Sequence, residues 1–162
     1  MASNLIFNEV TKYKPGTVYR LLSDCYVEIL DQQLQDQFQK FDQAVFSNPE
    51  TVGTCTFITT LDSKIAGMAS YDPRQAPELG IIGHNCILPE HRRKGCGKQQ
   101  IQEVVRRLKV IDVRHVSVST SEHPFFEPAR RMYLSCGFFE SAKQRKDPKD
   151  MYKTVYYEME LK

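Results

Sequence analysis

Two glycines and four basic side chains lie together in the segment 92–98, Arg-Arg-Lys-Gly-Cys-Gly-Lys. A mainly apolar run at 81–88 precedes it and predicts a buried strand, which Pro89 ends because proline has no N–H for the strand ladder. The apolar residues that follow keep the i, i+3, i+4, i+7 spacing of an amphipathic helix. They are Ile101, Val104, Val105 and Leu108. The segment is therefore a basic glycine turn between a strand and a helix.

A turn of this kind is suited to bind a phosphate or a pyrophosphate. The first N–H groups of a helix have no intrahelical acceptor and carry the positive end of the helix dipole. Gly95 and Gly97 would let the backbone approach an anion without a Cβ in the way. A plain strand-to-helix turn would need a single glycine, so the second one favours the binding interpretation. The four basic residues of the segment would add positive charge: Arg92, Arg93, Lys94 and Lys98.

Two common phosphate motifs are excluded by spacing. A P-loop needs a glycine at the position of Arg92 and a serine or threonine at the position of Gln99. A dinucleotide-binding fingerprint that starts at Gly95 would need glycine or alanine at the position of Gln100. The segment therefore belongs to neither class.

The pattern Arg92-x-x-Gly95-x-Gly97, after a strand that ends at Pro89, resembles the acyl-CoA pyrophosphate loop of the GNAT family of N-acetyltransferases. A second segment, 129–138, is similar to the downstream motif of that family. It runs Ala-x-x-x-Tyr-x-x-x-Gly-Phe, a helix that carries Tyr133 and then enters a strand. Two motifs at the expected separation make the resemblance specific between about 81 and 138.

The resemblance implies an α/β fold in which four helices flank a mixed, twisted central sheet of about seven strands. The residues predict the same succession of elements independently, from apolar periodicity and from turn residues. The predicted strands are 5–10, 54–60, 65–71, 79–88, 113–120, 138–142 and 152–161. The predicted helices are 16–29, 34–45, 98–108 and 128–136, and a charged loop is predicted over 143–150. We find no repeat or linker, and expect one domain over 1–162.

Composition restricts the classes of function. A hydrophobic content of 41% with 26% charged residues is typical of globular proteins. The net charge of +2 does not favour a nucleic-acid surface. No stretch approaches the roughly 18 apolar residues of a membrane span, and Met1–Asn4 does not open a signal peptide. Five cysteines without metal-ligand spacing predict free thiols, a cytoplasmic location and no metal.

The resemblance also implies roles for individual residues in binding acetyl-CoA as co-substrate. The end of the strand, Cys86, Ile87 and Leu88, would pair with the amides of the pantetheine arm and would polarise the thioester carbonyl. The whole segment 92–98 would bind the pyrophosphate, chiefly through its backbone N–H groups. Cys96 would be a small apolar filler and not a nucleophile.

Tyr133 would protonate the leaving thiolate as general acid, since its ordinary pKa is close to that of a thiol. The general base that takes the proton of the acceptor ammonium is left open between Glu122, His84 and Glu78, because a histidine in a strand is often structural and a water chain could serve. Phe126 stands where the family usually has an asparagine that contacts pantetheine, so that contact is in doubt.

The predicted function is acetyl-CoA-dependent transfer of an acetyl group to a primary amine of a small molecule or a peptide, within a ternary complex. The alternative is an acyl-CoA-binding or sensing domain without turnover. We expect no nucleic-acid or membrane partner and a monomer or homodimer.

Overall fold

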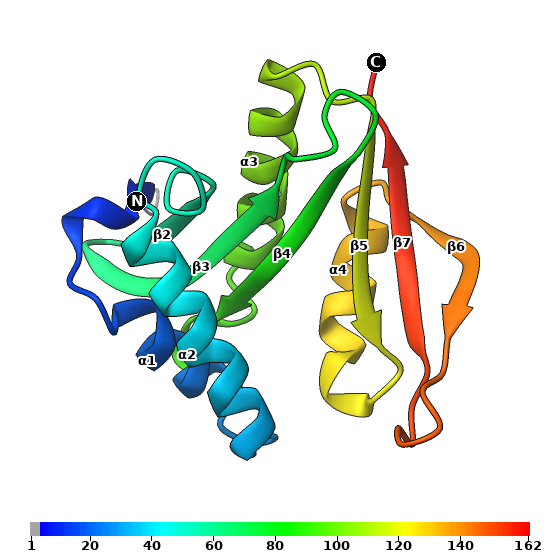
Figure 1. Ribbon diagram of the computed structural model, residues 1–162, viewed down its shortest axis with the longest axis horizontal. Helices are drawn as coiled ribbons and strands as arrows, with labels where there is room; N and C mark the ends of the chain where they lie inside the picture. Colours follow the sequence, from blue (N-terminus) through cyan, green and yellow to red (C-terminus); the bar gives the residue numbers. More distant parts are fainter. Residues whose placement is uncertain (1–3) are drawn as a thin grey trace. The chain divides into compact units, whose positions relative to one another are not determined.

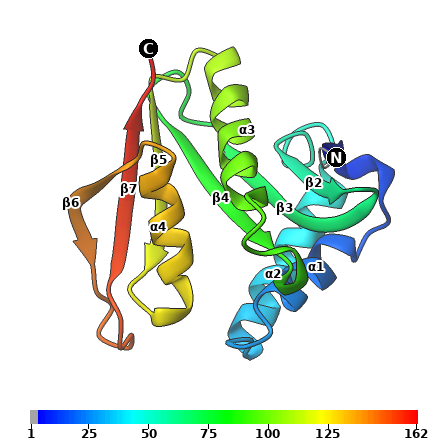
Figure 2. The same ribbon diagram turned by 180° about the vertical axis from the view of Figure 1, so that it is seen from behind.

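The computed structural model describes residues 4–162. Within this range, seven strands form one sheet in the order β1-β2-β3-β4-β5-β7-β6, with four α-helices between them (Figures 1 and 2). The strands are β1 (Leu5–Glu9), β2 (Thr56–Leu61), β3 (Lys64–Asp72), β4 (Gly80–Ile87), β5 (His115–Ser121), β6 (Phe139–Arg145) and β7 (Thr154–Glu160). The helices are α1 (Thr17–Cys25), α2 (Gln32–Ser47), α3 (Cys96–Val110) and α4 (Glu127–Ser135).

The predicted mixed α/β fold, with its order of strands and helices, is confirmed. Positions 1–3, on which the prediction of no signal peptide partly rests, lie outside the described residues. The chain forms two compact units, which are described separately below. Unit 1 comprises the chain up to Ser70 together with His84–Gln100, and unit 2 comprises Tyr71–Gly83 and Ile101–Lys162. The prediction of a single domain over 1–162 stays a prediction.

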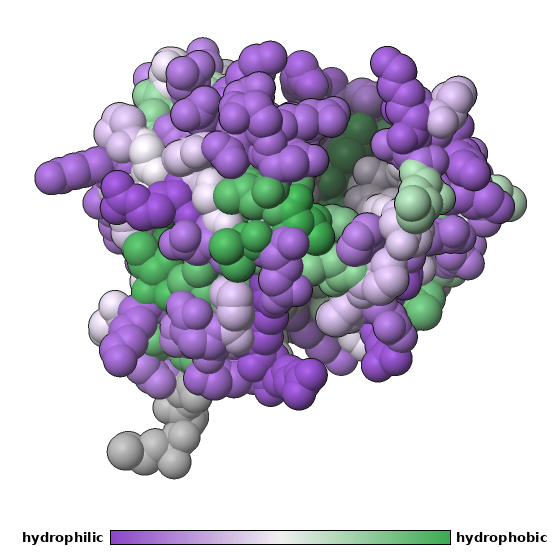
Figure 3. All heavy atoms as spheres, turned by 90° about the horizontal axis from the view of Figure 1, so that it is seen from below, coloured by the Kyte–Doolittle hydropathy of each residue, from purple (hydrophilic) through white to green (hydrophobic). Residues whose placement is uncertain are grey.

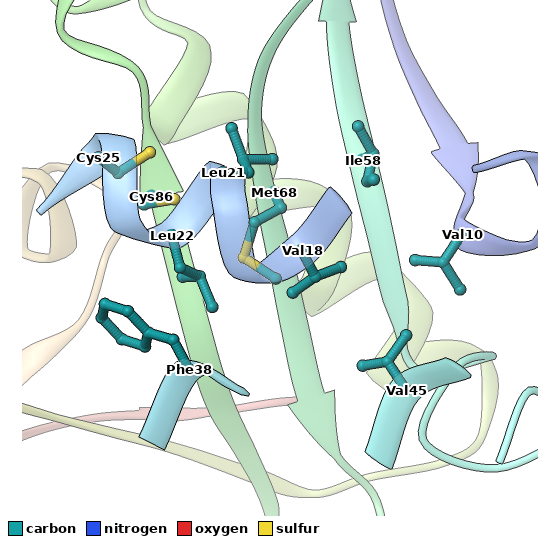
Figure 4. Close-up of a cluster of buried hydrophobic side chains, with 10 residues drawn as sticks. All are labelled: Val10, Val18, Leu21, Leu22, Cys25, Phe38, Val45, Ile58, Met68 and Cys86. Carbon is teal, nitrogen blue, oxygen red and sulfur yellow. The ribbon is translucent and has the colours of Figure 1, made fainter. Parts of the chain in front are cut away.

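The core of unit 1 is formed by α1 and α2 against the central strands. Leu22, Phe38, Ile58 and Met68 are each at most 2% exposed, and Figure 4 shows them with the other members of this cluster. Burial of a side chain of this size contributes about 1.5–3 kcal/mol. The core therefore fixes both helices against the strands that carry the candidate site.

A buried carboxylate of α2 caps the N-terminus of α1. Gly16 precedes α1 with a φ of 98°, a left-handed conformation that glycine adopts without strain. Asp42 is 6% exposed and accepts hydrogen bonds from the N–H groups of Gly16 (3.0 Å) and Tyr19 (2.9 Å). Because these N–H groups have no intrahelical acceptor, the contact ties the two helices together.

In unit 2, β5 and β6 pair antiparallel with β7, and α4 lies on one face of these strands (Figure 2). Its core includes Val116, Val118, Tyr133, Phe138 and Tyr157, all at most 4% exposed. The chain enters β6 through Gly137, whose φ of 96° is again left-handed. The Gly-Phe pair of the second motif thus reverses the chain between α4 and β6.

Strand β6 is longer than predicted. It was expected to end at 142, but Gln144 pairs with Val155 and Arg145 with Thr154, so the strand takes up the start of the predicted charged loop 143–150. Most side chains of β6 are exposed, and backbone pairing with β7 fixes the strand. Strand β6 therefore lacks the alternation of apolar and polar residues from which the end of the strand was predicted.

The surface is mostly hydrophilic, with hydrophobic side chains in places on the face that Figure 3 shows. Among the described residues, no helix combines the length and the apolarity needed to cross a membrane.

Candidate functional site

The C-terminal half of β4 has two backbone edges with different partners. The N–H of Leu88 donates to the carbonyl of Ala66 in β3 at 2.7 Å, so the even-numbered residues of this stretch face β3. Successive residues of a strand direct their N–H and C=O groups to opposite sides. Asn85 and Ile87 therefore face away from β3, and we call their side of β4 the outer edge.

Two side chains hold the carbonyls of the outer edge. The hydroxyl of Tyr26 donates to the carbonyl of Asn85 at 3.0 Å, and Nε of Arg92 donates to the carbonyl of Ile87 at 3.1 Å. Both donors belong to unit 1. Tyr26 is far from β4 in sequence, and Arg92 lies just beyond the end of the strand. The outer edge is thus a fixed backbone surface.

A buried glutamine fixes the inner edge, the side of β4 that faces β3. Gln100 is 1% exposed, and its Nε2 donates to the carbonyls of Met68 (3.0 Å) and Cys86 (3.3 Å). The amide stands where a regular ladder would place a backbone N–H. Because Gln100 belongs to the first turns of α3, it links the position of this helix to that of β4.

The basic glycine turn leads directly into α3. Gly95 has a φ of 81° and its carbonyl accepts the N–H of Gln99 at 3.1 Å, which starts the helix. Arg93 is also left-handed, with a φ of 64°. A non-glycine residue in this region costs about 1–3 kcal/mol, and such strain collects at ligand sites. The turn therefore has the backbone form of a binding loop.

A Cβ on either glycine of the turn would make only ordinary van der Waals contacts. A Cβ on Gly95 would meet its nearest neighbour, Nε2 of Gln99, at 3.9 Å, and a Cβ on Gly97 would meet Cγ1 of Ile87 at 3.6 Å. Packing inside the protein therefore does not demand a glycine at 97. Gly95 is exposed and Gly97 half-buried, so the N-terminus of α3 is accessible, and the neighbouring Arg93, Lys94 and Lys98 are exposed. These residues fit a pyrophosphate.

His84, in the C-terminal half of β4, lies among aromatic rings. Its ring centroid is 4.7 Å from that of Phe41 and 5.7 Å from that of Phe38, both on α2. Burial lowers the pKa of His84 below its ordinary value. At neutral pH the imidazole is thus uncharged and able to accept a proton.

Tyr133 belongs to unit 2 and is 3% exposed. Its ring packs against Phe138 at 5.9 Å and against Tyr157 at 5.7 Å. Burial raises the pKa of Tyr157, and the Glu140 carboxylate raises it further. The tyrosine of the second motif thus lies in an aromatic cluster, in which the phenol of Tyr157 is protonated at neutral pH.

The chain matches the model of the acetyltransferase (GNAT) family over residues 16–138. This is more than half of its length. The chain belongs to the GNAT acetyltransferase family.

Solved structures with the same fold cover nearly the whole of this GNAT chain. A protein assigned to the family, from Desulfovibrio desulfuricans, has a TM-score of 0.77 at 21% identity, over 98% of this chain and 99% of that one. The ribosomal-protein-S18-alanine N-acetyltransferase of Escherichia coli has a TM-score of 0.70 at 14% identity, over 98% and 94%. The yncA protein of Salmonella typhimurium, solved with its cofactor acetyl-CoA, has 0.70 at 10%, over 100% and 95%. None of the curated proteins compared with the sequence matches it.

The predicted site residues of this GNAT domain fall into both units. Unit 1 brings together the strand end, the glycine turn and His84, and unit 2 holds Tyr133, Glu122 and Glu78. Glu122 is exposed, and its N–H donates to the carbonyl of Lys153 at 3.0 Å. Glu78 is exposed as well and forms an ion pair with Arg114. Residues 4–162 contain no cluster of three or more side chains suited to bind a metal ion.

Phe126 occupies the position at which the resemblance implies an asparagine, and Phe125 precedes it. Both are half-buried, and their ring centroids lie 5.0 Å apart. Phe126 also lies 6.4 Å from the ring of His123. The two phenylalanines therefore pack as a pair in the turn before α4.

Arg92 has a structural contact that the sequence did not indicate. Besides Ile87, its guanidinium binds the carbonyl of Cys25 at the end of α1, with Nη2 at 2.7 Å. Hydrogen bonds from a charged donor contribute about 1.5–3 kcal/mol each. Arg92 thereby ties the end of α1 to the outer edge of β4.

Replacement of Arg92 should show how much its two backbone contacts contribute to stability. We expect Arg92→Ala to lower the free energy of unfolding by about 3 kcal/mol, because two carbonyls lose a charged donor. Arg93→Ala, which removes an exposed guanidinium from the same turn, is the matched control and should leave stability within about 0.5 kcal/mol. Urea denaturation measures both. Equal stability of the two variants would mean that the Arg92 contacts do not support the fold.

Proposed function

We propose that the protein is an acetyl-CoA-dependent N-acetyltransferase that transfers the acetyl group directly to a primary amine. The observation that carries this proposal is the accessible N-terminus of α3, with Gly95 and Gly97 open to an anion, beside the fixed outer edge of β4. Such a pair of surfaces suits a ligand that has both a diphosphate and a chain with peptide-like amides. Family membership supports the same donor.

The donor would be held at three places in unit 1. The backbone N–H groups at the start of α3 and the basic residues around them bind the pyrophosphate. The outer edge, from Asn85 to Ile87, pairs with the amides of the pantetheine arm. N–H groups of the same edge donate to the thioester oxygen and stabilise the negative charge that develops on it during attack.

The raised pKa values of two buried cysteines favour direct transfer over an acetylated cysteine intermediate. Burial raises the pKa of the Cys86 thiol well above its ordinary value, and the side chain of Cys25 raises it further. Burial also raises the pKa of Cys96. Only a thiolate is a good nucleophile, so neither cysteine is prepared to accept the acetyl group. This supports attack of the amine on the thioester itself.

We propose His84 as the general base, ahead of Glu122 and Glu78. Its lowered pKa keeps the imidazole neutral at pH 7, so it can take a proton from the acceptor ammonium. The exposed Glu122 has no comparable environment. We assign the general acid to Tyr133, whose hydroxyl would give its proton to the departing CoA sulfur.

The charge of unit 1 supports a cationic acceptor. The segment 17–47, which contains α1 and α2, has five acidic and two basic residues. The segment 89–98, which contains the glycine turn, has four basic residues and one acidic residue. The first segment favours an ammonium group and the second favours phosphates. We further propose that the protein works in the cytoplasm as a monomer or homodimer, without nucleic acid, membrane or metal.

The experiment that tests this function is a thiol-release assay with acetyl-CoA and three classes of amine. We would use 2-phenylethylamine, spermidine and a peptide with a free N-terminal alanine, with mass spectrometry of the products. Transfer to at least one of them is expected. The alternative, an acyl-CoA-binding domain without turnover, predicts tight binding of acetyl-CoA and release of CoA no faster than in buffer.

Gly97→Val should weaken acetyl-CoA binding without unfolding the protein. The internal space accepts a Cβ at 3.6 Å from its nearest neighbour, so we expect stability within about 1 kcal/mol of the wild type. The new methyl groups would cover the helix N-terminus, and the dissociation constant for acetyl-CoA should rise about 100-fold by calorimetry, which is about 2.7 kcal/mol. Gln102→Val, on the exposed side of the same helix, is the control. An unchanged affinity would place the pyrophosphate elsewhere.

A further inference from the structure

We propose that Tyr26 positions the acceptor amine for attack, its hydroxyl oxygen accepting a hydrogen bond from the attacking nitrogen. This inference rests on the proposed function and assigns a residue to its acceptor side. Tyr26 lies in the connection between α1 and α2, outside both sequence motifs, and residue spacing gives it no role.

The hydroxyl of Tyr26 is held in one place by three contacts. The N–H of Tyr26 donates to the carbonyl of Leu22 at 3.0 Å and closes the last turn of α1. Its ring packs on Phe38, with centroids 5.5 Å apart at 34°. The hydroxyl then donates to the carbonyl of Asn85 at 3.0 Å. A side chain fixed at its backbone, its ring and its hydroxyl is well suited to orient a reactant.

The position of this hydroxyl is next to the proposed reacting group. Asn85 lies on the outer edge, whose N–H groups are proposed to polarise the thioester oxygen. A group within hydrogen-bond distance of the Asn85 backbone therefore lies beside the carbon under attack. Tyr26 is half-buried, and its neighbour Val27 is 61% exposed, so this part of the α1–α2 connection is open to solvent.

The direction of the hydrogen bond decides what Tyr26 offers to a substrate. A phenol has one proton to donate and lone pairs with which it accepts. Because its proton is directed at the Asn85 carbonyl, the hydroxyl can act toward a substrate only as an acceptor of an N–H bond. A primary amine keeps two N–H bonds while its own lone pair attacks. One of them can donate to Tyr26, which aims the nitrogen lone pair at the carbonyl carbon.

The test compares Tyr26→Phe with Tyr19→Phe, a matched removal of a phenol hydroxyl seven residues earlier, on α1. The ring of Tyr26 keeps its contact with Phe38 in the variant, so folding should be preserved. Steady-state kinetics would use the amine among 2-phenylethylamine, spermidine and the alanine peptide that the wild type acetylates fastest. We expect Tyr26→Phe to lower kcat/KM for this amine about 10- to 100-fold, while Tyr19→Phe stays within twofold.

Two further readouts distinguish a role of Tyr26 in positioning the amine from a role in holding β4. The dissociation constant for acetyl-CoA and the rate of acetyl-CoA hydrolysis without amine report on the outer edge itself. Because Arg92 still holds the carbonyl of Ile87 in Tyr26→Phe, both should change by less than about threefold, far less than kcat/KM for the amine. An equal loss of acetyl-CoA affinity would overturn the inference, since Tyr26 would then only maintain the outer edge. An unchanged kcat/KM for the amine would overturn it as well. If the wild type binds acetyl-CoA but acetylates none of the amines, the proposed function itself fails.

Discussion

Gly67→Ala is expected to destabilise the protein by about 3 kcal/mol, although it adds a single methyl group. A Cβ at this position in β3 would lie 2.2 Å from the carbonyl oxygen of Cys86 and 2.7 Å from Cδ1 of Ile87. The first of these atoms is backbone and cannot move without shifting β4. The melting temperature should fall by about 6–12 °C. Thermal denaturation followed by circular dichroism measures the change.

Gly97→Ala is the control for this experiment. Its Cβ would meet nothing closer than 3.6 Å, so the same chemical change should leave the melting temperature within about 2 °C. If Gly67→Ala were as stable as this control, β3 and β4 would have to lie further apart than the structure has them. The contact between Gly67 and β4 would then not determine where the outer edge lies.

Tyr133→Phe is expected to lower kcat by about 10²- to 10⁴-fold, the usual contribution of a general acid. The variant keeps the ring contacts with Phe138 and Tyr157, so the fold and the acetyl-CoA dissociation constant should stay close to those of the wild type. Without the phenol, CoA would depart as an unprotonated thiolate or would have to take its proton from water. The assay is thiol release at saturating acetyl-CoA with the preferred amine.

Tyr157→Phe removes the neighbouring hydroxyl of the same aromatic cluster and serves as its control. Its ring also packs on Tyr133, so both variants disturb the packing to a similar extent. Turnover of Tyr157→Phe should stay within about threefold of the wild type. Wild-type turnover in Tyr133→Phe would remove the general acid from that residue, and similar losses in the two variants would indicate a packing effect.

The elements that position the site could be predicted from local patterns in the sequence. Pro89, the glycines of the turn and the apolar spacing after them predict a strand, a turn and a helix, and the structure confirms these elements. Their signals lie within a few residues of one another. The left-handed φ of Gly95 is also what a glycine at such a turn indicates.

The contacts that fix the outer edge could not be predicted in this way. Tyr26 meets Asn85 across 59 positions of sequence, and Arg92 meets Cys25 across 67. Neither pair has a spacing that periodicity could detect, and a tyrosine after a helix has many structural uses. Arg92 was expected to bind or brace the phosphate loop, and its bonds to two backbone carbonyls depend on where α1 ends.

The structural role of Gln100 could not be predicted for a different reason. In the sequence it excluded a dinucleotide fingerprint, and nothing local indicated that its amide would be buried between the carbonyls of Met68 and Cys86. A glutamine in the first turns of a helix is usually solvated. Its role follows from the close approach of β3 and β4 at Gly67, which depends on tertiary packing.

The melting temperature of the purified protein with and without acetyl-CoA tests the central claim most directly. Acetyl-CoA at about a hundred times its dissociation constant should raise the free energy of unfolding by about 2.7 kcal/mol, and therefore the melting temperature by about 5–11 °C. CoA should have a similar effect, and ATP and NAD should have none. No shift with acetyl-CoA, or an equal shift with ATP, would contradict the assignment of the turn around Gly95 and the outer edge of β4 as an acyl-CoA site.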